Sequence, residues 1–514
     1  MRITFTLAAS FALALPMLEA GDFNGDGFED LAVGAPTETI GGLEDAGAVH
    51  VIPGSASGPN PAAALRIDAT TVGAVAADSD RFANSLAWGD FNGDGFDDLA
   101  IGCRRAKVGA LTFAGRVYIV PGGVAGFDFS QVRAFDQNTK GIKDKVESDG
   151  FPGQSGEGFG ARLASGDFDG NGFDDLAIQV DSERIGKVKG AGAVHVLYGS
   201  GVGLRAKRNQ FWHQNSKGIQ EKCEEYEWFG TGLATGDLNG DGRDELVVSC
   251  PGEQTSHLGR GRVAVLFGSK KGLRAKGNRL LMPDSEAIPL TENSGWNTPK
   301  LACGDFDGDG FIDIAIGMTN VSATVGGLAH GAVFIARGSA TGPTSGLMDS
   351  FAQGVGGVPG LGSDFDAFGA TLAVGDFDGD ARHDLAIAAT GEAIPDDACG
   401  RVTVLYGSIA GLGVTGVDVF DQGTAGIDGV PEQFDQFGIT LAGADTDGDG
   451  AAELVVGVPF ENLGGAIDAG AFHVMFGSAI AGLTTAGTLL VEQDTPGIIG
   501  APGDDHMFAG SIAQ

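Results

Sequence analysis

Cysteine is scarce in this chain, and its placement excludes several classes of site. The 514 residues include five cysteines and no Cys-x-x-Cys pair. The sequence therefore contains no zinc or dithiol redox motif, and the cysteines do not form a disulfide framework. We expect them to be small buried residues at strand ends, with a Cys223–Cys250 bridge as the one pairing left open. The five are Cys103, Cys223, Cys250, Cys303 and Cys399.

Basic residues and long apolar runs are also few. Lys and Arg total 32 against 68 Asp and Glu, which gives a formal net charge of -36. Nucleic acid and anionic membrane surfaces need basic patches, so neither is expected as the main partner. Beyond the N-terminus, no segment is long and apolar enough to cross a bilayer, which predicts no transmembrane segment. We expect a monomer.

Known catalytic signatures are missing as well. The sequence has no Gly-x-Ser-x-Gly elbow, no His-Glu-x-x-His and no Walker loop. Aspartate pairs suit a glycosidase, but nearly all of them lie in the loops described next. Three of the eight histidines, His50, His195 and His473, recur at one strand position, which favours packing over catalysis. The sequence therefore predicts no enzyme activity.

What the chain does contain is one acidic loop repeated seven times, at intervals of 68 to 77 residues. The pattern is Asp-x-Asp/Asn-x-Asp/Asn-Gly/Ala-x-x-Asp/Glu, followed by an apolar strand. Side-chain oxygens at positions 1, 3 and 5, a backbone carbonyl at position 7 and a carboxylate at position 9 make a shell of the kind that calcium prefers. Magnesium fits less well, because it demands near-ideal octahedral geometry. We therefore predict up to seven Ca²⁺ ions.

The predicted ligands, taken loop by loop, are Asp22, Asn24, Asp26, Phe28 and Asp30; Asp90, Asn92, Asp94, Phe96 and Asp98; Asp167, Asp169, Asn171, Phe173 and Asp175; Asp237, Asn239, Asp241, Arg243 and Glu245; Asp305, Asp307, Asp309, Phe311 and Asp313; Asp376, Asp378, Asp380, Arg382 and Asp384; and Asp445, Asp447, Asp449, Ala451 and Glu453. The loop differs from an EF-hand, since it closes at position 9 and a strand follows. Loop 6 has Ala381 where the others have Gly, which predicts strain at a left-handed turn.

Around each loop the sequence repeats a plan of four short strands. A segment such as 159–167, Phe-Gly-Ala-Arg-Leu-Ala-Ser-Gly-Asp, precedes the loop, and strands such as 98–102, 192–200 and 135–142 exemplify the other three. With 89 glycines and few runs of helical spacing, the chain is predicted to be all-β. Four strands in each of seven repeats predict a seven-bladed β-propeller of four-stranded blades, with a calcium loop in each blade.

The combination of Phe-Gly, the acidic loop and an intact Gly34-Ala35-Pro36 resembles FG-GAP repeats. Such repeats form the seven-bladed propeller at the N-terminal head of integrin alpha chains and occur in many secreted bacterial proteins. The resemblance covers essentially the whole chain and implies a calcium-binding propeller, but it says little about activity. The sequence departs from the pattern at Trp296-Asn297, where Phe-Gly is expected, and at Ser249-Cys250-Pro251, which replaces Gly-Ala-Pro.

The expected domain plan is a signal peptide followed by one propeller. Residues 1–20 have one positive charge, a short apolar core and small residues, as in a secretory signal; the alternative is a first strand. The single propeller spans 21–514, with blades near 21–81, 82–158, 159–228, 229–295, 296–367, 368–436 and 437–507. Residues 508–514 repeat the opening strand and are predicted to close the ring.

These features favour a secreted, cell-surface or periplasmic adhesion module that binds an extracellular protein or surface glycan. The alternatives are a propeller lectin and a polysaccharide hydrolase or lyase. A basic and aromatic stretch from Arg205 to Trp228 either packs as a fourth strand or binds a ligand. Within it, Trp212 and Tyr226 fall outside the strand alignment and are the candidate ligand-binding residues.

Overall fold

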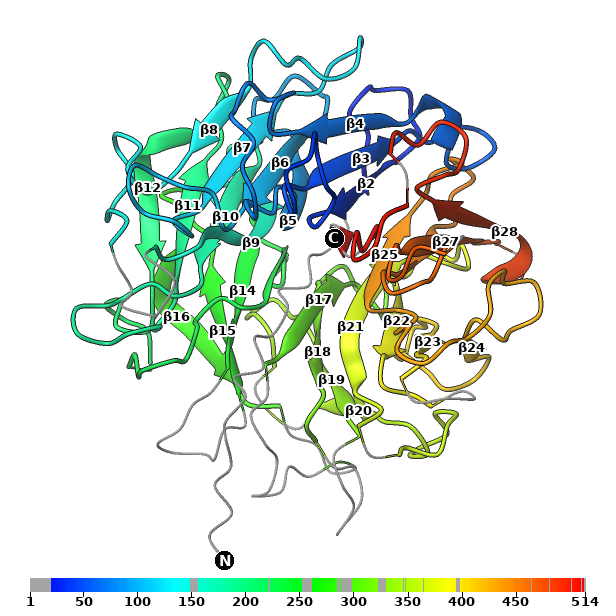
Figure 1. The fold of residues 1–514 in the computed structure, drawn as a ribbon. Coiled ribbons are helices and arrows are strands. Elements are labelled where there is room, and N and C mark those ends of the chain that lie inside the picture. The colour runs from blue at the N-terminus through cyan, green and yellow to red at the C-terminus, as the bar shows by residue number, and fades with distance from the viewer. Residues whose placement is uncertain are drawn as a thin grey trace, which may run out of the picture.

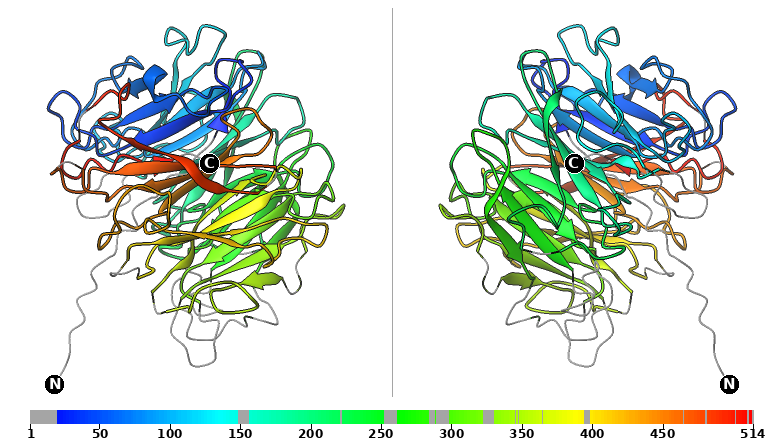
Figure 2. Two further views of the ribbon diagram at one scale, coloured as in Figure 1. Left: turned by 90° about the vertical axis from the view of Figure 1, so that its right-hand side faces the viewer. Right: turned by 90° about the vertical axis from the view of Figure 1, so that its left-hand side faces the viewer.

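The computed structural model describes residues 20–147, 156–220, 222–251, 261–283, 288, 298–321, 330–344, 346, 348–363, 365–393, 398–463, 465–479, 481–500, 502–509 and 511–512. Within these ranges, seven antiparallel sheets surround a central channel (Figure 1; Figure 2). Six have four strands, and the sheet of blade 1 has a fifth, short strand from the C-terminal end of the chain. The prediction of an all-β, seven-bladed propeller is confirmed. Trp296 and Asn297, and residues 1–19 of the predicted signal peptide, lie outside the described residues.

The strands follow one another outward from the channel in each blade. Blade 1 contains β1 (Ala20–Gly21), β2 (Asp30–Ala35), β3 (Ala48–Ile52) and β4 (Leu65–Asp68), with a short 3-10 helix η1 (Pro61–Ala63); blade 2 contains β5 (Ser85–Gly89), β6 (Asp98–Cys103), β7 (Arg116–Val120) and β8 (Arg133–Phe135); blade 3 contains β9 (Phe159–Gly166), β10 (Asp175–Val180), β11 (Ala193–Tyr198) and β12 (Arg205–Trp212); and blade 4 contains β13 (Leu233–Gly236), β14 (Glu245–Cys250), β15 (Arg262–Phe267) and β16 (Arg274–Leu281).

The remaining three blades repeat this order. Blade 5 contains β17 (Lys300–Gly304), β18 (Asp313–Met318), β19 (Ala332–Ala336) and β20 (Asp349–Phe351); blade 6 contains β21 (Phe368–Gly375), β22 (Asp384–Ala389), β23 (Arg401–Leu405) and β24 (Asp418–Phe420); blade 7 contains β25 (Thr440–Ala444), β26 (Glu453–Val458), β27 (Ala471–Phe476) and β28 (Thr484–Glu492); and β29 (Ser511–Ile512) returns to blade 1. Blade 5 therefore forms even though its repeat departs from the Phe-Gly pattern.

Neighbouring blades bury each other's apolar faces. Every residue of the second strands is buried, as in β6 and β10, because both faces of these strands are covered. One core cluster joins Val117 and Ile119 of blade 2 to Phe159 and Leu163 of blade 3, and similar clusters fill the other junctions. Six phenylalanines of the Phe-Gly pattern, including the one in the closing segment, are fully inaccessible to solvent: Phe82, Phe159, Phe229, Phe368, Phe437 and Phe508.

Polar side chains also cross the junctions, on the face opposite the acidic loops. The amide nitrogen of Gln137 in blade 2 donates to Glu183 of blade 3 at 2.8 Å. The same link joins blades 5 and 6 and blades 6 and 7, through Gln353 with Glu392 at 2.7 Å and Gln422 with Glu461 at 2.6 Å. The three glutamines are buried, so these hydrogen bonds stabilise the blade junctions, because an unpaired buried amide would be costly.

Cys223 is a free cysteine, so the Cys223–Cys250 bridge left open by the sequence does not form. The Cys223 sulfur lies 4.0 Å from Nδ1 of His213, while the Cys250 thiol donates to the carbonyl oxygen of Val248 within its own strand. Both residues are buried. The expectation of small buried residues is met at four of the five positions, since Cys303 is half-buried.

The two ends of the chain together supply the innermost strand of blade 1. Leu31 and Asp30 of β2 pair with Ala20 and Gly21 of β1, whereas the next part of β2 pairs with β29 from the C-terminus. Figure 1 shows the C-terminal end at the inner edge of this blade. The predicted closing strand is therefore present, but it shares its place with the residues just before Asp22.

Phe508 anchors this closure between blades 7 and 1. Its ring lies edge-on to His50 of blade 1, with centroids 5.1 Å apart, and 5.8 Å from Phe472 of blade 7. Its backbone N–H donates to Ala469 at 2.9 Å. Gly470 has a φ of +86° and touches the Phe508 carbonyl so closely that a β-carbon would not fit. Closure thus depends on residues about 450 positions apart along the chain.

We predict that Phe508→Ala lowers the free energy of unfolding by about 3 to 5 kcal/mol, the usual cost of removing a buried phenylalanine ring. Urea denaturation followed by circular dichroism measures the change. Phe365→Ala is the matched control, because Phe365 is 80% exposed, and it is expected to alter stability by less than about 0.5 kcal/mol. Equal effects of the two substitutions would contradict the closing role of Phe508.

Candidate metal centres

Each acidic loop is a tight turn between the first and second strands, held by its own carboxylates. In loop 1, Asp22 accepts the N–H groups of Gly25 at 2.6 Å and Gly27 at 2.9 Å, and Asp26 accepts the N–H of Phe28 at 3.1 Å. Loop 2 repeats these bonds at Asp90 and Asp94. Because Asp22 and Asp26 hold the turn in this way, their carboxylates point toward its centre.

The carboxylate at position 9 joins the acidic loop to the loop between strands three and four. Asp30 is fully buried, and it accepts the N–H of Phe23 at 3.1 Å and that of Gly54, between β3 and β4, at 2.9 Å. Asp384 makes the same two bonds, to Phe377 at 2.8 Å and Gly407 at 2.7 Å. Position 9 therefore sits at the base of each loop, where it completes the ring of oxygens.

In four loops the carboxylate oxygens converge within 4.8 Å of one another. These groups are Asp167, Asp169 and Asp175; Asp305, Asp307 and Asp309; Asp376, Asp378 and Asp384; and Asp445, Asp447 and Glu453. In loops 2 and 4, position 3 is an asparagine whose amide donates to position 9: Asn92 to Asp98 at 3.1 Å and Asn239 to Glu245 at 2.7 Å. Positions 3 and 9 therefore face each other in these loops as well.

Several of these oxygens are buried without a hydrogen-bond donor. They are Oδ1 of Asp169, Oε2 of Glu245, Oδ2 of Asp313 and Oε1 of Glu453. Burial raises the pKa of Asp175 and of Glu453 to about 8. Buried carboxylates that lack donors are stabilised by a cation. The residues present therefore fit an oxygen-seeking metal ion.

Position 7 differs between loops, and two loops place an arginine there. Arg243 donates to the position-5 carboxylate of Asp241 at 2.9 Å, and Arg382 donates to that of Asp380 at 2.6 Å. These arginines are confined to loops 4 and 6. An arginine beside a ligand carboxylate competes with a cation for its charge, so loops 4 and 6 are expected to bind metal more weakly than the others.

A second set of acidic residues, which the sequence analysis missed, lies at position 8 and faces the channel. Glu29 accepts the N–H of Asp445 at 2.7 Å, and Asp97 accepts that of Asp22 at 2.9 Å. In loop 6, His383 accepts the N–H of Asp305 at 2.9 Å. The polar side chains at position 8 thus link their loops to the first loop residue of a neighbouring blade, and Asp174 and Asp244 make the same bond. The sequence signal was visible, since four of the seven position-8 residues are acidic.

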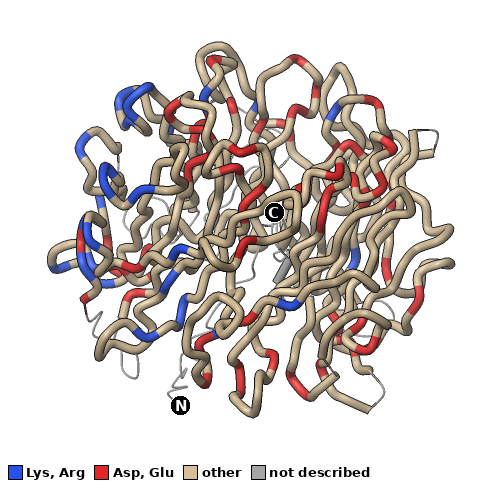
Figure 3. The backbone as a smooth tube through the Cα atoms, turned by 90° about the horizontal axis from the view of Figure 1, so that it is seen from above, with Lys and Arg blue, Asp and Glu red and all other residues tan. Residues whose placement is uncertain are grey.

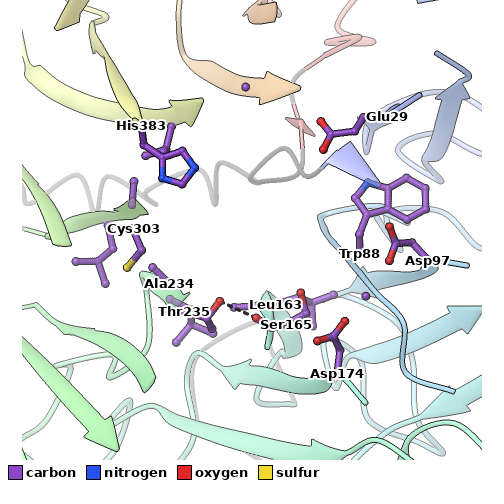
Figure 4. Close-up of a pocket in the computed structure, with 17 residues that line it drawn as sticks. Glu29, Trp88, Asp97, Leu163, Ser165, Asp174, Ala234, Thr235, Cys303 and His383 are labelled. Carbon is purple, nitrogen blue, oxygen red and sulfur yellow. Dashed lines mark hydrogen bonds between the residues drawn. The ribbon is translucent and has the colours of Figure 1, made fainter. Parts of the chain in front are cut away.

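These position-8 side chains surround the mouth of a cavity of about 470 Å³ in the central channel. Figure 4 shows Glu29, Asp97 and Asp174 along one side and His383 on the other. Burial, together with neighbouring carboxylates such as Asp174, raises the pKa of Asp97 to about 6. The channel mouth is therefore acidic on one side.

The two residues predicted to bind a ligand lie in different surroundings. Trp212 ends β12, packs partly against the core between blades 3 and 4 and donates from Nε1 to Gln210 at 3.0 Å. Tyr226 lies in the following loop, where its N–H donates to Lys189 at 2.9 Å and its ring stands 6.3 Å from Trp228. Trp212 thus has a packing role, and Tyr226 lies among the loops opposite the acidic loops.

The three recurring histidines are buried in the third strands, as the packing interpretation predicts. Burial lowers the pKa of His195 to about 3 and that of His473 to about 4. Nε2 of His50 lies 2.8 Å from a carboxylate oxygen of Glu38. His195 and His473 therefore stay neutral near pH 7 and have no access to a substrate.

Comparison with known proteins agrees with this architecture. The sequence pattern of the FG-GAP repeat matches residues 18–52, 82–120, 159–197, 229–266, 368–405 and 437–475. The chain carries six FG-GAP repeats. Each matched repeat runs from the innermost strand through the acidic loop to the third strand. Blade 5 forms a seventh blade without such a match.

Two relatives with these repeats are much longer than the matched region. Integrin alpha-PS2 of Drosophila melanogaster is 29% identical over 260 residues, which cover 49% of this chain and 16% of the integrin. Phosphatidylinositol-glycan-specific phospholipase D of Mus musculus is 29% identical over 236 residues, which cover 45% of this chain and 25% of that protein. The matches thus span a quarter or less of these proteins.

Among solved structures, rhamnogalacturonan lyase YesW shares 12% sequence identity with this chain, with a TM-score of 0.38 over 86% of this chain and 69% of the lyase. At that TM-score, the likeness carries no argument about fold or activity. The sequence match identifies the FG-GAP repeats, and the strand pairing identifies the seven sheets.

The strain expected at position 6 of loop 6 is present. Ala381 has a φ of +67°, and Gly27 at the same position in loop 1 has a φ of +87°. We predict that Ala381→Gly raises the free energy of unfolding by about 1 kcal/mol, because glycine adopts this conformation without a β-carbon clash. Thermal denaturation measures the effect. Ala486→Gly, at an exposed position without positive φ, should instead be destabilising; stabilisation by both would contradict the explanation.

Proposed function

We propose that this chain is a secreted FG-GAP propeller that binds calcium in its acidic loops and serves as an interaction module for an extracellular protein or surface glycan. The observation that carries the calcium proposal is the set of buried, donor-free oxygens at positions 3 and 9. Side chains at positions 1, 3, 5 and 9 and the carbonyl at position 7 would hold up to seven ions. Calcium suits these loops because it accepts six to eight oxygen ligands in flexible geometry.

The proposed location is outside the cell, at its surface or in the periplasm. It is supported by the signal-like composition of residues 1–20 and by the need of such loops for free calcium, which is near 1 mM outside cells. No helix among the described residues is long and apolar enough to cross a membrane. We propose that the protein is a monomer.

The proposed role is binding rather than catalysis. Buried, neutral histidines such as His195 cannot exchange protons with a substrate, and the acidic clusters are explained by a structural cation. A propeller that presents variable loops on a rigid ring is well suited to recognition. In this chain, the loops opposite the acidic loops vary most in length, as in 106–114 and 143–158, although 148–155 lie outside the described residues.

We predict that calcium stabilises the fold. With about 1 mM calcium and site constants of about 0.01 to 0.1 mM, each site contributes roughly 1.4 to 2.7 kcal/mol by mass action. Seven such sites would rival the total stability of an ordinary domain, roughly 5 to 15 kcal/mol. Chelation should therefore lower the melting temperature strongly. Adding excess calcium should restore it, whereas the same concentration of magnesium should not. An unchanged melting temperature would remove the calcium proposal.

We predict that Tyr226 contributes to partner binding on the face opposite the acidic loops. Arrays of surface glycans and extracellular proteins, probed in 1 mM calcium, would identify the partner. Tyr226→Ala should then weaken binding about tenfold, as expected for an interface anchor, without lowering the melting temperature. Val124→Ala is the control, since Val124 is 86% exposed and lies between the third and fourth strands on the acidic-loop face. A stronger effect of Val124→Ala would place the partner on that face.

A further inference from the structure

The outermost strands of blades 3 and 4 form a positively charged surface on an acidic protein. Figure 3 shows Lys and Arg gathered on one side of the molecule, the side where β12 and β16 lie in Figure 1. Seven exposed residues make up this surface, which we name the basic strip. They are Arg205, Lys207 and Arg208 on β12, Lys270 and Lys271 in the loop before β16, and Arg274 and Lys276 on β16.

The basic strip is built from a repeated motif that the propeller fold does not require. Residues 203–207 and 272–276 both read Gly-Leu-Arg-Ala-Lys. Arg205 pairs with Tyr198 and Arg274 with Phe267, so the two copies have the same register. None of the fourth strands of the other five blades contains this motif. A repeat confined to two adjacent outer strands indicates a shared surface.

The two copies lie side by side. The amide nitrogen of Gln210 in β12 donates to the carbonyl of Leu273 at 3.0 Å, and the Leu273 N–H donates to the Tyr198 hydroxyl at 3.0 Å. Arg133 of blade 2 extends the positive surface at one end, where burial and the charge of Arg205 lower its pKa. The basic strip therefore runs across the rim of two blades as one continuous surface.

The basic strip is not balanced by ion pairs within the described residues. None of its seven members forms an ion pair there; the Arg274 guanidinium instead donates to backbone carbonyls of Gly268 and Lys276 and lies 5.5 Å from the Phe267 ring. Arginines elsewhere do pair, as Arg116 does with Asp136 at 2.9 Å. Asp169 lies close enough to the basic strip to be affected by its charge. Burial raises the pKa of Asp169, and the positive charge of Arg208 partly offsets that rise.

The backbone of Arg208 adopts a left-handed conformation that is strained for a residue with a side chain. Its φ is +77°, and the equivalent bulge positions in blades 4 and 7 are Gly277 at +85° and Gly487 at +86°. A residue with a β-carbon is strained in this conformation, whereas glycine is not. Because Arg208 is exposed and its replacement by glycine would relieve that strain, the retained charge indicates a function outside the fold.

We infer that the basic strip binds a linear polyanionic polysaccharide through its carboxylate or sulfate groups. Arginine pairs with both groups through two parallel hydrogen bonds. The site is separate from the partner face proposed above and goes beyond it. At physiological salt, charges interact over a Debye length of about 8 Å. A thin anionic polymer can lie along the basic strip and stay close to its positive charges alone. A flat anionic membrane would also approach the acidic surfaces of the protein, whose net charge is -36, and would be repelled by them.

The test uses the whole calcium-loaded chain with two probes, heparin as a sulfated polymer and hyaluronate as a carboxylated one. The native chain should bind at least one, more weakly as salt rises. Lys207→Glu combined with Lys276→Glu makes one change in each motif copy. The double variant should bind the polymer about tenfold or more weakly, because the two new glutamates repel its anionic groups. The matched control is Lys107→Glu with Lys187→Glu, two exposed lysines outside the basic strip, which should change affinity less than about twofold.

A second variant separates charge from structure. Arg208→Gly should weaken polymer binding severalfold and raise the melting temperature, whereas a merely structural role for Arg208 would lower it. The inference is overturned if neither polymer binds, if the control pair loses as much affinity as the strip pair, or if anionic vesicles or single-stranded DNA bind more tightly than both polymers. Tyr226→Ala should leave polymer binding unchanged, so failure here and failure of the proposed partner face are distinguishable.

Discussion

The structure depends on mutual burial between blades. Each sheet buries its apolar faces mainly against its two neighbours, as the cluster around Phe159 shows. A ring of such sheets is stable only when it closes. Closure rests on the composite first strand, where β1 and β29 share β2, and on Phe508 between blades 7 and 1. The strands β1 and β29, far apart along the chain, are therefore structural parts of the ring.

The acidic loops follow from the same constraint. Position 9 ties the acidic loop to the turn between the third and fourth strands of its own blade, as Asp30 does with Gly54, and position 8 ties it to the neighbouring blade, as Asp97 does with Asp22. The loops thus bring many negative charges into close, partly buried contact. Crowded carboxylates raise one another's pKa unless a cation balances them, so a divalent ion would couple stability within each blade to the contacts between blades.

Much of this was predictable from the sequence, and the remainder has a physical reason. A period near 70 residues specifies repeated local structure, so the seven blades, the loop positions and the buried histidines followed from it. Contacts between repeats were not predictable in this way. The position-8 side chains such as Glu29 meet at the channel mouth only once the seven blades are arranged in a closed ring. The division of the first strand between β1 and β29 likewise depends on how the ring closes. The basic and aromatic stretch was noticed, but only the structure placed Arg205 beside the second motif copy on β16.

Recognition in a repeat protein is expected where the repeats differ, because identical positions are needed to build the ring. The second strands and the acidic loops barely vary among the blades, and they are buried or carry the candidate metal ligands. The outer strands vary freely, since one edge of each faces solvent. Among the described fourth strands, β12 and β16 gather positive charge, and Arg208 lies at a bulge where two other blades have glycine. The same ring that is made stable by uniform repeats thus leaves its outer edge available for binding.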